Sequence, residues 1–254
     1  MFLNTPQKSV ELFHLLFLRQ LNERLDKSLY ALKGGCNLRF FFKSIRYSED
    51  IDLDVKTVAK ETLRSKVYKL LDNPAFHQTL SSHGIELHQI SEAKQTDTTQ
   101  RWKLGLKCSG ISMLIPTKIE FSRRKFDEKT EFEAIDPELI HTYRLYPILV
   151  NHYLQETAFI QKVDALIHRS ETQARDIFDL ELLMNRGVQP QHLPEALRKD
   201  LPLAVENALK IDFPAFKAQV VAYLMEEYQQ HYNSPQVWAH LQTKVAAMLR
   251  EAQR

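Results

Sequence analysis

The architecture of the chain can be worked out from residues 32–55, which read LKGGCNLRFFFKSIRYSEDIDLDV. The last six residues alternate aspartate with an aliphatic residue, and strict alternation is typical of a strand with one polar and one apolar face. Asp50, Asp52 and Asp54 then share the polar face. Because neighbouring carboxylates repel one another, we expect a cationic partner beside this strand.

The pair Gly34–Gly35 separates a short apolar run, residues 29–32, from an amphipathic segment, residues 37–43. This order predicts a strand, a turn and a helix. Glycines let backbone N–H groups approach an anion closely, and the N-terminus of a helix favours negative charge. Followed by Asp-x-Asp on the next strand, the pair indicates a phosphate site, although a tight turn alone would also need glycine.

The rest of the first half predicts two helical stretches and three consecutive strands. Helical spacing covers residues 5–25 and 57–81, the second interrupted at Asn73–Pro74. Three consecutive runs separated by turn residues then predict strands, at 85–94, 100–108 and 111–123. The expected fold class is α+β, with a mixed, partly antiparallel sheet and flanking helices.

The third of these strands adds another carboxylate. Lys118 and Glu120 alternate with Ile119 and Phe121, so Glu120 lies on a polar face. Beside a strand of aspartates we interpret Glu120 as a third metal ligand, a role for which Asp54 competes. The alternative is a solvated outer face with a cross-strand ion pair.

Composition excludes several classes of protein. The chain has 254 residues, enough for one large or two smaller domains, and a net charge of +2. Near neutrality gives no global field for a nucleic-acid partner. The two cysteines predict no disulfide, and the apolar run 12–18 is too short to span a membrane. We therefore expect a cytoplasmic protein.

The second half reads as helical. Residues 136–155 contain prolines and are expected to link a first domain, residues 1–150, to a second, residues 151–254. Short breaks divide the second domain into four helical segments, at 156–186, 191–209, 213–232 and 235–253. Short connections between helices predict a C-terminal helical bundle.

One helical segment carries unusual charges. Lys162, Arg169 and Asp176 are spaced by sevens, so an unbroken helix would align them with a drift of about 20° per step. Apolar neighbours indicate that Lys162 is partly buried. The pattern fits either a phosphate-binding lysine with a catalytic carboxylate or a satisfied ion pair, and Arg175 with Asp179 offers further local salt bridges.

The candidate carboxylates favour one kind of chemistry. Two aspartates at i and i+2 on a strand lie about 6.8 Å apart at Cα, so their carboxylates can converge on divalent ions. Oxygen ligands favour Mg²⁺ or Mn²⁺. Such ions stabilise in-line displacement at phosphorus, which predicts nucleotidyl or phosphoryl transfer from an NTP.

Several motifs in order resemble one family. Residues 33–35, 38–39 and 46–52 are similar to the N-terminal motifs of AbiEii-type nucleotidyltransferase toxins, and residues 162–169 and 175–180 are similar to their later lysine and Arg-Asp-x-x-Asp motifs. This is an abortive-infection family of type IV toxin–antitoxin systems. It belongs to the polymerase-beta-like nucleotidyltransferase superfamily, whose fold the resemblance implies here.

The resemblance also implies roles for individual residues. Asp50 and Asp52 would bind metal, Lys162 would contact phosphate, and Asp176 would be the acceptor-activating or second essential carboxylate. The residues expected to bind the nucleotide are Gly34, Gly35, Arg39, Arg46, Ser48, Arg169 and Asp179.

The resemblance further implies an Mg²⁺-dependent toxin that transfers a nucleotide to the tRNA 3′ end, blocks translation and is controlled by an antitoxin. Candidates for contacting RNA are the basic run 123–125 and Arg39, Lys43 and Arg46. Two alternatives stay open. In the first alternative, the nucleotide acceptor is a small molecule or a protein hydroxyl. In the second, the chain is a non-catalytic module that binds nucleotide or antitoxin.

Overall fold

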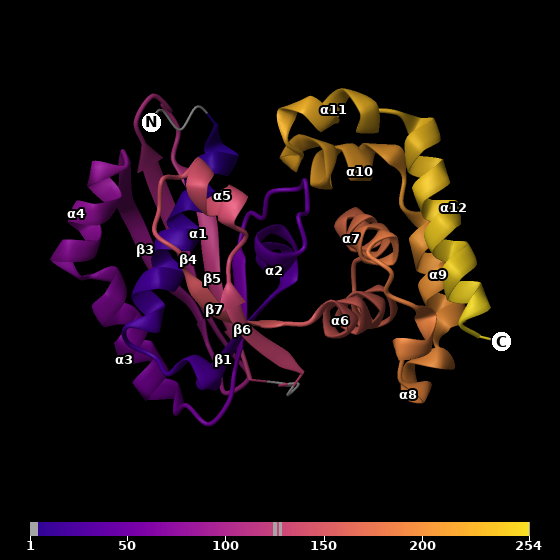
Figure 1. Ribbon diagram of the computed structural model, residues 1–254, viewed down its shortest axis with the longest axis horizontal. Coiled ribbons are helices and arrows are strands. Elements are labelled where there is room, and N and C mark those ends of the chain that lie inside the picture. The colour runs from indigo at the N-terminus through magenta and orange to yellow at the C-terminus, as the bar shows by residue number, and fades with distance from the viewer. Residues whose placement is uncertain (1–4, 124–125, 127–128, 254) are drawn as a thin grey trace. The chain divides into compact units, whose positions relative to one another are not determined.

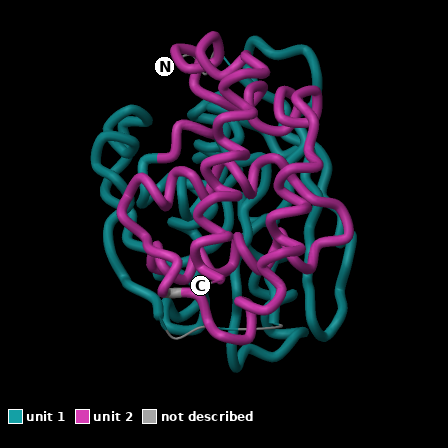
Figure 2. The backbone as a smooth tube through the Cα atoms, turned by 90° about the vertical axis from the view of Figure 1, so that its right-hand side faces the viewer, with its two compact units in different colours: residues 1–43, 47–153 teal, residues 44–46, 154–254 magenta. Residues whose placement is uncertain are grey.

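The computed structural model describes residues 5–123, 126 and 129–253. The chain forms two compact units, which Figure 1 shows as a ribbon and Figure 2 in separate colours. The first unit consists of residues 1–43 and 47–153, and the second of residues 44–46 and 154–254. The short segment 44–46 therefore leaves the first unit and joins the second.

A seven-stranded mixed sheet forms the centre of the first unit, in the order β3-β4-β5-β2-β1-β7-β6. Its strands are β1 (Tyr30–Lys33), β2 (Ile51–Val55), β3 (Ile85–Gln95), β4 (Thr99–Cys108), β5 (Ile115–Ser122), β6 (Thr130–Ala134) and β7 (Leu149–Tyr153). The central strand β2 runs antiparallel to β1 and parallel to β5. The predicted mixed sheet and the predicted strand of alternating aspartates are confirmed.

Helices cover the apolar face of this sheet. The first unit contains α1 (Pro6–Asn22), α2 (Gly34–Phe41), α3 (Lys60–Leu71), α4 (Pro74–Ser82), α5 (Pro137–Thr142) and the short 3₁₀ helix η1 (Lys27–Leu29). The side chain of Thr5 caps α1 by accepting a hydrogen bond from the N–H of Lys8. The helices α1, α3 and α4 lie on one side of the sheet (Figure 1) and share a buried core with Ile51 and Leu53. The aspartates of β2 consequently point to the opposite face.

The sequence did not predict β6, α5 and β7. Residues 136–155 were expected to be a connection, but they contain α5 and β7, and β7 pairs in parallel with β1 inside the sheet. The strand β6 reads TEFEA and is largely exposed at the sheet edge. Short strands with polar or mixed residues lack the periodic signal that a longer strand shows, so only pairing with distant strands defines them.

The second unit is helical. It contains α6 (Gln155–His168), α7 (Ala174–Asn185), α8 (Glu195–Arg198), α9 (Leu201–Lys210), α10 (Phe213–Gln219), α11 (Glu226–Tyr232), α12 (Pro235–Glu251) and the 3₁₀ helices η2 (Pro190–His192) and η3 (Val221–Tyr223). The segment 44–46 joins this unit through an isolated bridge between Arg46 and Leu224. In addition, the N–H of Met225 donates to the carbonyl of Ile45 at 2.9 Å.

The expectation of one unbroken helix through Lys162, Arg169 and Asp176 is wrong. The helix α6 ends at His168, Arg169 has an extended backbone with ψ of 134°, and α7 begins only at Ala174. Packing of α6 against α7, and not alignment along one helix, brings the charged residues together.

Candidate active site

Four charged residues form a row across the polar face of the sheet. Lys33 of β1 pairs in register with Asp52 of β2, Asp52 with Glu120 of β5, and Glu120 with Arg101 of β4. Residues opposite one another in register point to the same face. The predicted meeting of Glu120 with the aspartate strand is therefore confirmed, and a cation lies at each end of the row.

The outer carboxylates of the candidate metal site have basic partners. The Nζ of Lys118 lies 2.7 Å from Asp50 Oδ2, and Nε of Arg101 donates to Glu120 Oε2 at 2.6 Å. The side chains of Asp50 and Glu120 keep 22% and 25% of their surface exposed, so solvent and ligands can reach both. The expected cationic partners thus come from the chain itself.

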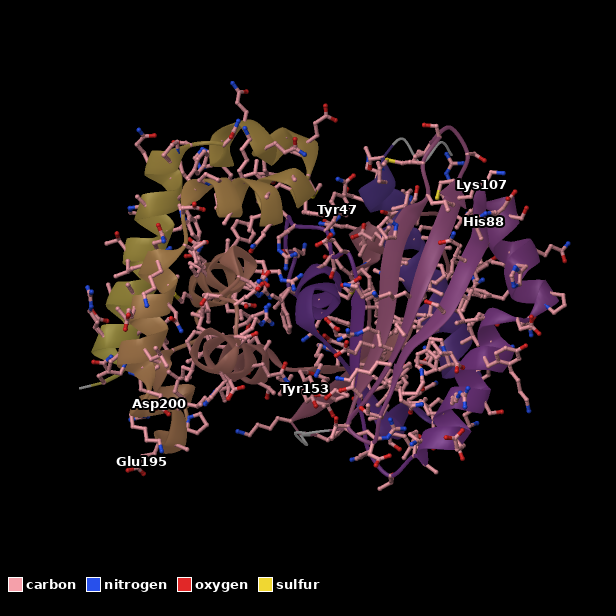
Figure 3. All side chains as sticks on the ribbon, turned by 180° about the vertical axis from the view of Figure 1, so that it is seen from behind. Tyr47, His88, Lys107, Tyr153, Glu195 and Asp200 are labelled. Carbon is pink, nitrogen blue, oxygen red and sulfur yellow. The ribbon has the colours of Figure 1, made fainter. Side chains whose placement is uncertain are left out.

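Asp54 has a different environment from the other two aspartates. Its side chain is 4% exposed, with Oδ1 against Lys33 Nζ at 2.5 Å and Oδ2 accepting from the Tyr153 hydroxyl at 2.9 Å. Tyr153 ends β7 and is labelled in Figure 3. Because both oxygens of Asp54 are engaged inside the sheet, Glu120 is the better candidate for a third ligand.

The glycine pair opens α2 beside Asp52. Gly34 is the first residue of α2 and has a φ of +68°, and a Cβ placed on it would lie 2.8 Å from Asp52 Oδ2. Only glycine allows this backbone conformation together with such a close approach. The predicted order of strand, glycines and helix is confirmed, and it brings Asp52 to the N-terminus of α2, where Gly35 is the second helical residue.

Ser48 stabilises the turn that leads into β2. Its hydroxyl donates to the backbone carbonyl of Asp50 at 2.8 Å, and the Thr117 hydroxyl donates to the carbonyl of Glu49 at 2.7 Å. The Ser48 proton is therefore used within the protein, while its oxygen keeps acceptor capacity.

The carboxylates fit a divalent cation in type and in face, because every donor is an oxygen and Asp52 lies opposite Glu120. Among the residues that the structure describes, no group of three or more His, Cys, Asp or Glu side chains is arranged around a common metal position. Asp50 and Glu120 contact Lys118 and Arg101 instead. A cation held by Asp50, Asp52 and Glu120 would replace these two ion pairs.

The basic residues expected to contact RNA are engaged elsewhere. Arg39 donates to the buried carboxylate of Glu11 at 2.7 Å and lies over the ring of Tyr47, which Figure 3 labels. Lys43 contacts Asp136 and Glu138.

The basic run 123–125 offers little to an RNA partner in the part that can be described. Arg123 donates to the carbonyl of Val58 at 3.3 Å, and burial lowers its pKa. Arg124 and Lys125 lie outside the described residues.

The helical unit contains the second set of predicted residues as one buried ion cluster. Lys162 Nζ lies 2.9 Å from Asp176 Oδ1 and 2.6 Å from Asp179 Oδ2. Arg46 lies 3.0 Å from Asp179, and Arg169 lies 2.9 Å from Asp176. Both aspartates are almost completely buried, whereas the side chain of Arg169 is 36% exposed.

Charge keeps Asp179 ionised in this cluster. Burial by itself raises the pKa of Asp179, but the charges of Arg46 and Lys162 outweigh burial and hold the pKa below its usual value of 3.8. Arg46 is therefore a structural partner of α7 and brings residues 44–46 into the helical unit.

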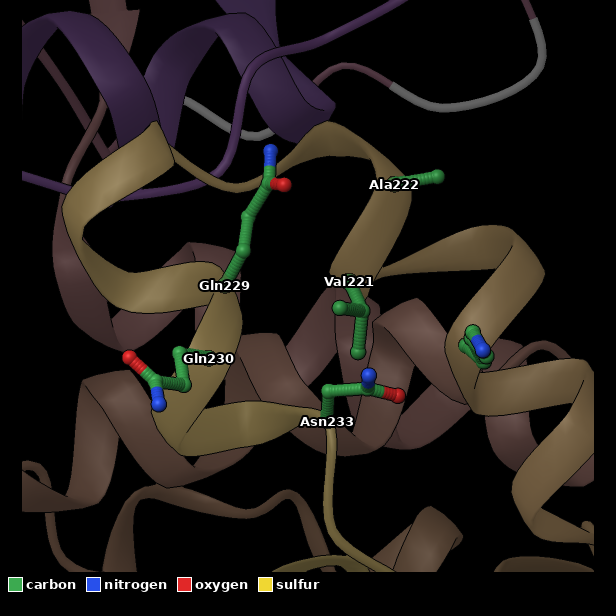
Figure 4. Close-up of a pocket in the computed structure, with 6 residues that line it drawn as sticks. Val221, Ala222, Gln229, Gln230 and Asn233 are labelled. Carbon is green, nitrogen blue, oxygen red and sulfur yellow. The ribbon is translucent and has the colours of Figure 1, made fainter.

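A shallow pocket lies elsewhere in the helical unit (Figure 4). It is lined by Lys217, Val221, Ala222, Gln229, Gln230 and Asn233. Three of these six residues carry an amide group, and the cluster around Lys162 contributes no residue to the lining.

Sequence reasoning missed the role of Arg101 and of Tyr153. Arg101 and Lys103 alternate with Trp102 and Leu104, so periodicity could have placed Arg101 on the polar face. Nothing local signals Tyr153, because its contact with Asp54 spans 99 residues of chain.

Comparison with known proteins shows the family of the chain. Residues 16–242 match the family described as "Nucleotidyl transferase AbiEii toxin, Type IV TA system". The chain belongs to the AbiEii nucleotidyltransferase toxin family. It is accordingly a nucleotidyltransferase, and the predicted family is confirmed.

Solved structures share the fold of this AbiEii family member. MenT4, a nucleotidyltransferase toxin from Mycobacterium tuberculosis, is 16% identical with a TM-score of 0.64, over 98% of this chain and 92% of that chain. JHP933 from Helicobacter pylori is 19% identical with a TM-score of 0.60, over 96% and 94% of the two chains. No curated protein matches the sequence.

The helices and the cysteines of this AbiEii family member bear on two expectations from the sequence. Within the described ranges, the helices are all too short or too polar to cross a membrane. Cys36 and Cys108 are buried free thiols.

Proposed function

We propose that this nucleotidyltransferase uses a divalent metal, Mg²⁺ or Mn²⁺, to transfer a nucleotide from an NTP to the 3′ end of tRNA. The observation that carries the proposal is the row of carboxylates on the polar sheet face, with Asp52 opposite Glu120 and Asp50 beside them. Oxygen donors on one open face suit Mg²⁺. Asp50, Asp52 and Glu120 would hold the cation.

The reaction replaces one bond at phosphorus by another. The hydroxyl oxygen of the acceptor bonds to the α-phosphorus, the bond to the β-phosphate breaks, and pyrophosphate leaves while the hydroxyl proton passes to one of the three carboxylates. A bound divalent cation supplies charge neutralisation at the phosphates and lowers the barrier to displacement. The N-terminus of α2, with Gly34 and Gly35, favours negative charge beside Asp52.

The helical unit contributes cations for the nucleotide phosphates in this proposal. Lys162 and Arg169 would bind them, with Arg169 the more exposed of the two. Asp176 and Asp179 would act through Lys162 and Arg169, because both carboxylates are buried against these bases. Arg46 would hold Asp179, and Ser48 would hold the turn before Asp50.

Basic side chains on the sheet support a polyanionic acceptor. Lys103 and Lys118 oppose each other in register on β4 and β5, on the face that also carries Glu120. Lys103 is exposed, and Lys118 keeps 43% of its side-chain surface. A tRNA end would meet positive charge directly beside the carboxylates, and the toxin would block translation in the cytoplasm by modifying it. The type IV description of the family supports a cognate antitoxin.

The test is incorporation of label from each of the four NTPs into total tRNA, with Mg²⁺ and with EDTA. We expect label at the 3′ end with Mg²⁺ only, and a fall of about 10²-fold or more for Asp52→Asn, which keeps the shape and removes the charge. Asp54→Asn is the matched control on the same strand face. It should lower the melting temperature but change the rate less than threefold.

Three results would contradict the proposal. If Asp52→Asn labels tRNA as well as the wild-type protein does, Asp52 is not part of the active site. Label in a metabolite or protein fraction and none in RNA would show that the acceptor is a small molecule or a protein, and not tRNA. Absence of Mg²⁺-dependent NTP binding by calorimetry would indicate a non-catalytic module.

A further inference from the structure

A buried hydrogen-bond network lies beneath the turn that leads into β2. It consists of His14 from α1, Cys36 from α2 and Thr117 from β5, which expose 0%, 1% and 2% of their surface. All three belong to the first unit. Polar side chains in such a position cost stability unless they are paired, and an aliphatic residue would pack at lower cost.

The direction of these hydrogen bonds follows from the number of protons. The Thr117 hydroxyl has one proton, which it donates to the carbonyl of Glu49 at 2.7 Å. Its second contact, with His14 Nε2 at 2.8 Å, must therefore be accepted from the imidazole. This assigns the tautomer of His14 with the proton on Nε2, and it leaves the Nδ1 lone pair towards Cys36 Sγ at 3.5 Å.

The same network reaches the next carbonyl. Cys36 Sγ lies 3.3 Å from the carbonyl oxygen of Asp50, to which the Ser48 hydroxyl also donates. The thiol has one proton, which lies between two acceptors, Nδ1 of His14 and the carbonyl of Asp50. Thr117 and Ser48 donate their own protons to the carbonyls of Glu49 and Asp50. These two peptides flank the Cα of Asp50, and their orientation sets the direction of its side chain.

His14 is suited to a fixed role because its charge does not change. Burial lowers its pKa to about 3, so the imidazole is neutral at physiological pH and the tautomer persists. The neighbours of the ring in the network, Cys36 and Thr117, are uncharged. A neutral imidazole can hold two partners on opposite sides of its ring, which an aliphatic side chain cannot do.

We propose that His14 is a positioning residue for the metal-binding carboxylates. Through Thr117 and Cys36 it fixes the peptides of Glu49 and Asp50, and it thereby holds the Asp50 carboxylate at the spacing from Asp52 that a divalent cation requires. This inference rests on the proposed function for the identity of the metal ligands.

The experiment measures Mn²⁺ binding to the full-length protein without nucleotide, from free Mn²⁺ by electron paramagnetic resonance. Loss of such outer partners typically weakens metal affinity, so we expect about a tenfold increase in Kd for His14→Leu and for Thr117→Val. His14→Gln keeps an N–H near the position of Nε2, and Thr117→Ser keeps the hydroxyl. Both should remain within twofold of the wild-type Kd.

A matched control separates positioning from general loss of stability. Ser9→Ala removes one buried hydroxyl from α1, where Ser9 donates to the carbonyl of Thr5 and, within the described part of the chain, makes no hydrogen bond with His14, Cys36 or Thr117. It should leave the Kd for Mn²⁺ unchanged. Thr117→Val keeps the test valid if His14→Leu does not fold, because valine has the shape of threonine.

The two proposals fail in different ways. Wild-type Kd values in folded His14→Leu and Thr117→Val would overturn the positioning role alone. A protein that binds Mn²⁺ through Asp52 but transfers no nucleotide would overturn the proposed function, while weaker Mn²⁺ binding by Thr117→Val would still support the role of His14.

Discussion

At the scale of single residues, the environment of each carboxylate decides its use. Asp50, Asp52 and Asp54 repeat along one strand, yet Asp54 is buried between Lys33 and Tyr153 while Asp50 stays partly exposed beside Lys118. A buried carboxylate with both oxygens bound gains little by exchanging its partners for a metal ion. An exposed one can exchange a lysine for a cation at low cost.

Gly34→Ala should reduce nucleotidyl transfer more than it reduces stability. The added methyl group would lie 2.8 Å from Asp52 Oδ2, and displacing that carboxylate should lower the rate by about 10²-fold. The φ of +68° adds a cost of about 1–2 kcal/mol in the free energy of unfolding. Initial rates and urea denaturation measure the two effects.

Gly110→Ala is the control for backbone strain. Gly110 has a φ of +82°, and a Cβ there meets nothing within 4 Å. The two variants should lose similar stability, and Gly110→Ala should keep its rate. Equal rates for both would show that the approach of Gly34 to Asp52 does not matter for activity.

At the scale of elements, α7 is held by buried charge. Asp176 and Asp179 are three residues apart and point to the same side of the helix, towards Lys162 of α6 and towards Arg46. Burying such a cluster costs desolvation, which the ion pairs within it offset. It therefore specifies where α6, α7 and the segment 44–46 meet.

Asp179→Leu should destabilise the helical unit by about 3–5 kcal/mol, because the buried charges of Arg46 and Lys162 would both lose the carboxylate that they contact. The double variant Arg46→Met with Asp179→Leu should recover a large part of this loss. Urea denaturation of both single variants and the double variant gives the coupling energy.

The exposed pair Lys210–Glu206 on α9 provides a matched control in the same unit. Glu206→Gln should change the free energy of unfolding by less than about 1 kcal/mol. A similarly small change for Asp179→Leu would contradict the structural role of the Arg46–Asp179 pair.

At the scale of the whole molecule, the two units should respond differently to acid. His14 in the sheet unit has a pKa of about 3, below the unfolded value of 6.5, so the unfolded state takes up a proton first as the pH falls. The contribution of neutral His14 to the free energy of unfolding is complete above pH 6.5 and decreases as the pH falls towards 3. Asp179 in the helical unit has a pKa lowered from 3.8, so its contribution is lost only as the pH falls below 3.8.

Between pH 6.5 and 5, His14 should therefore lower the free energy of unfolding of the sheet unit by up to about 1.4 kcal/mol for each pH unit. Asp179 does not change the free energy of unfolding of the helical unit in this range. Each unit contains one tryptophan, Trp102 and Trp238. Urea denaturation followed by fluorescence in Trp238→Phe and Trp102→Phe reports the units separately. His14→Gln should reduce the slope of the sheet unit to the part that His152 contributes, because burial lowers the pKa of His152 to about 4. His88→Gln, on the exposed surface of β3, should leave the slope unchanged, and equal slopes in all variants would contradict the assignment.

The sequence by itself determined the strand of alternating aspartates, the glycines before α2, the α+β class and the family, because these depend on local periodicity and on motifs in order. It also placed Glu120 on the correct face. The tertiary structure alone decided that Asp54 is enclosed by Lys33 and Tyr153, and that Arg46 belongs to the helical unit. These contacts join residues up to 133 positions apart, and local spacing contains no information about which distant cation meets which carboxylate.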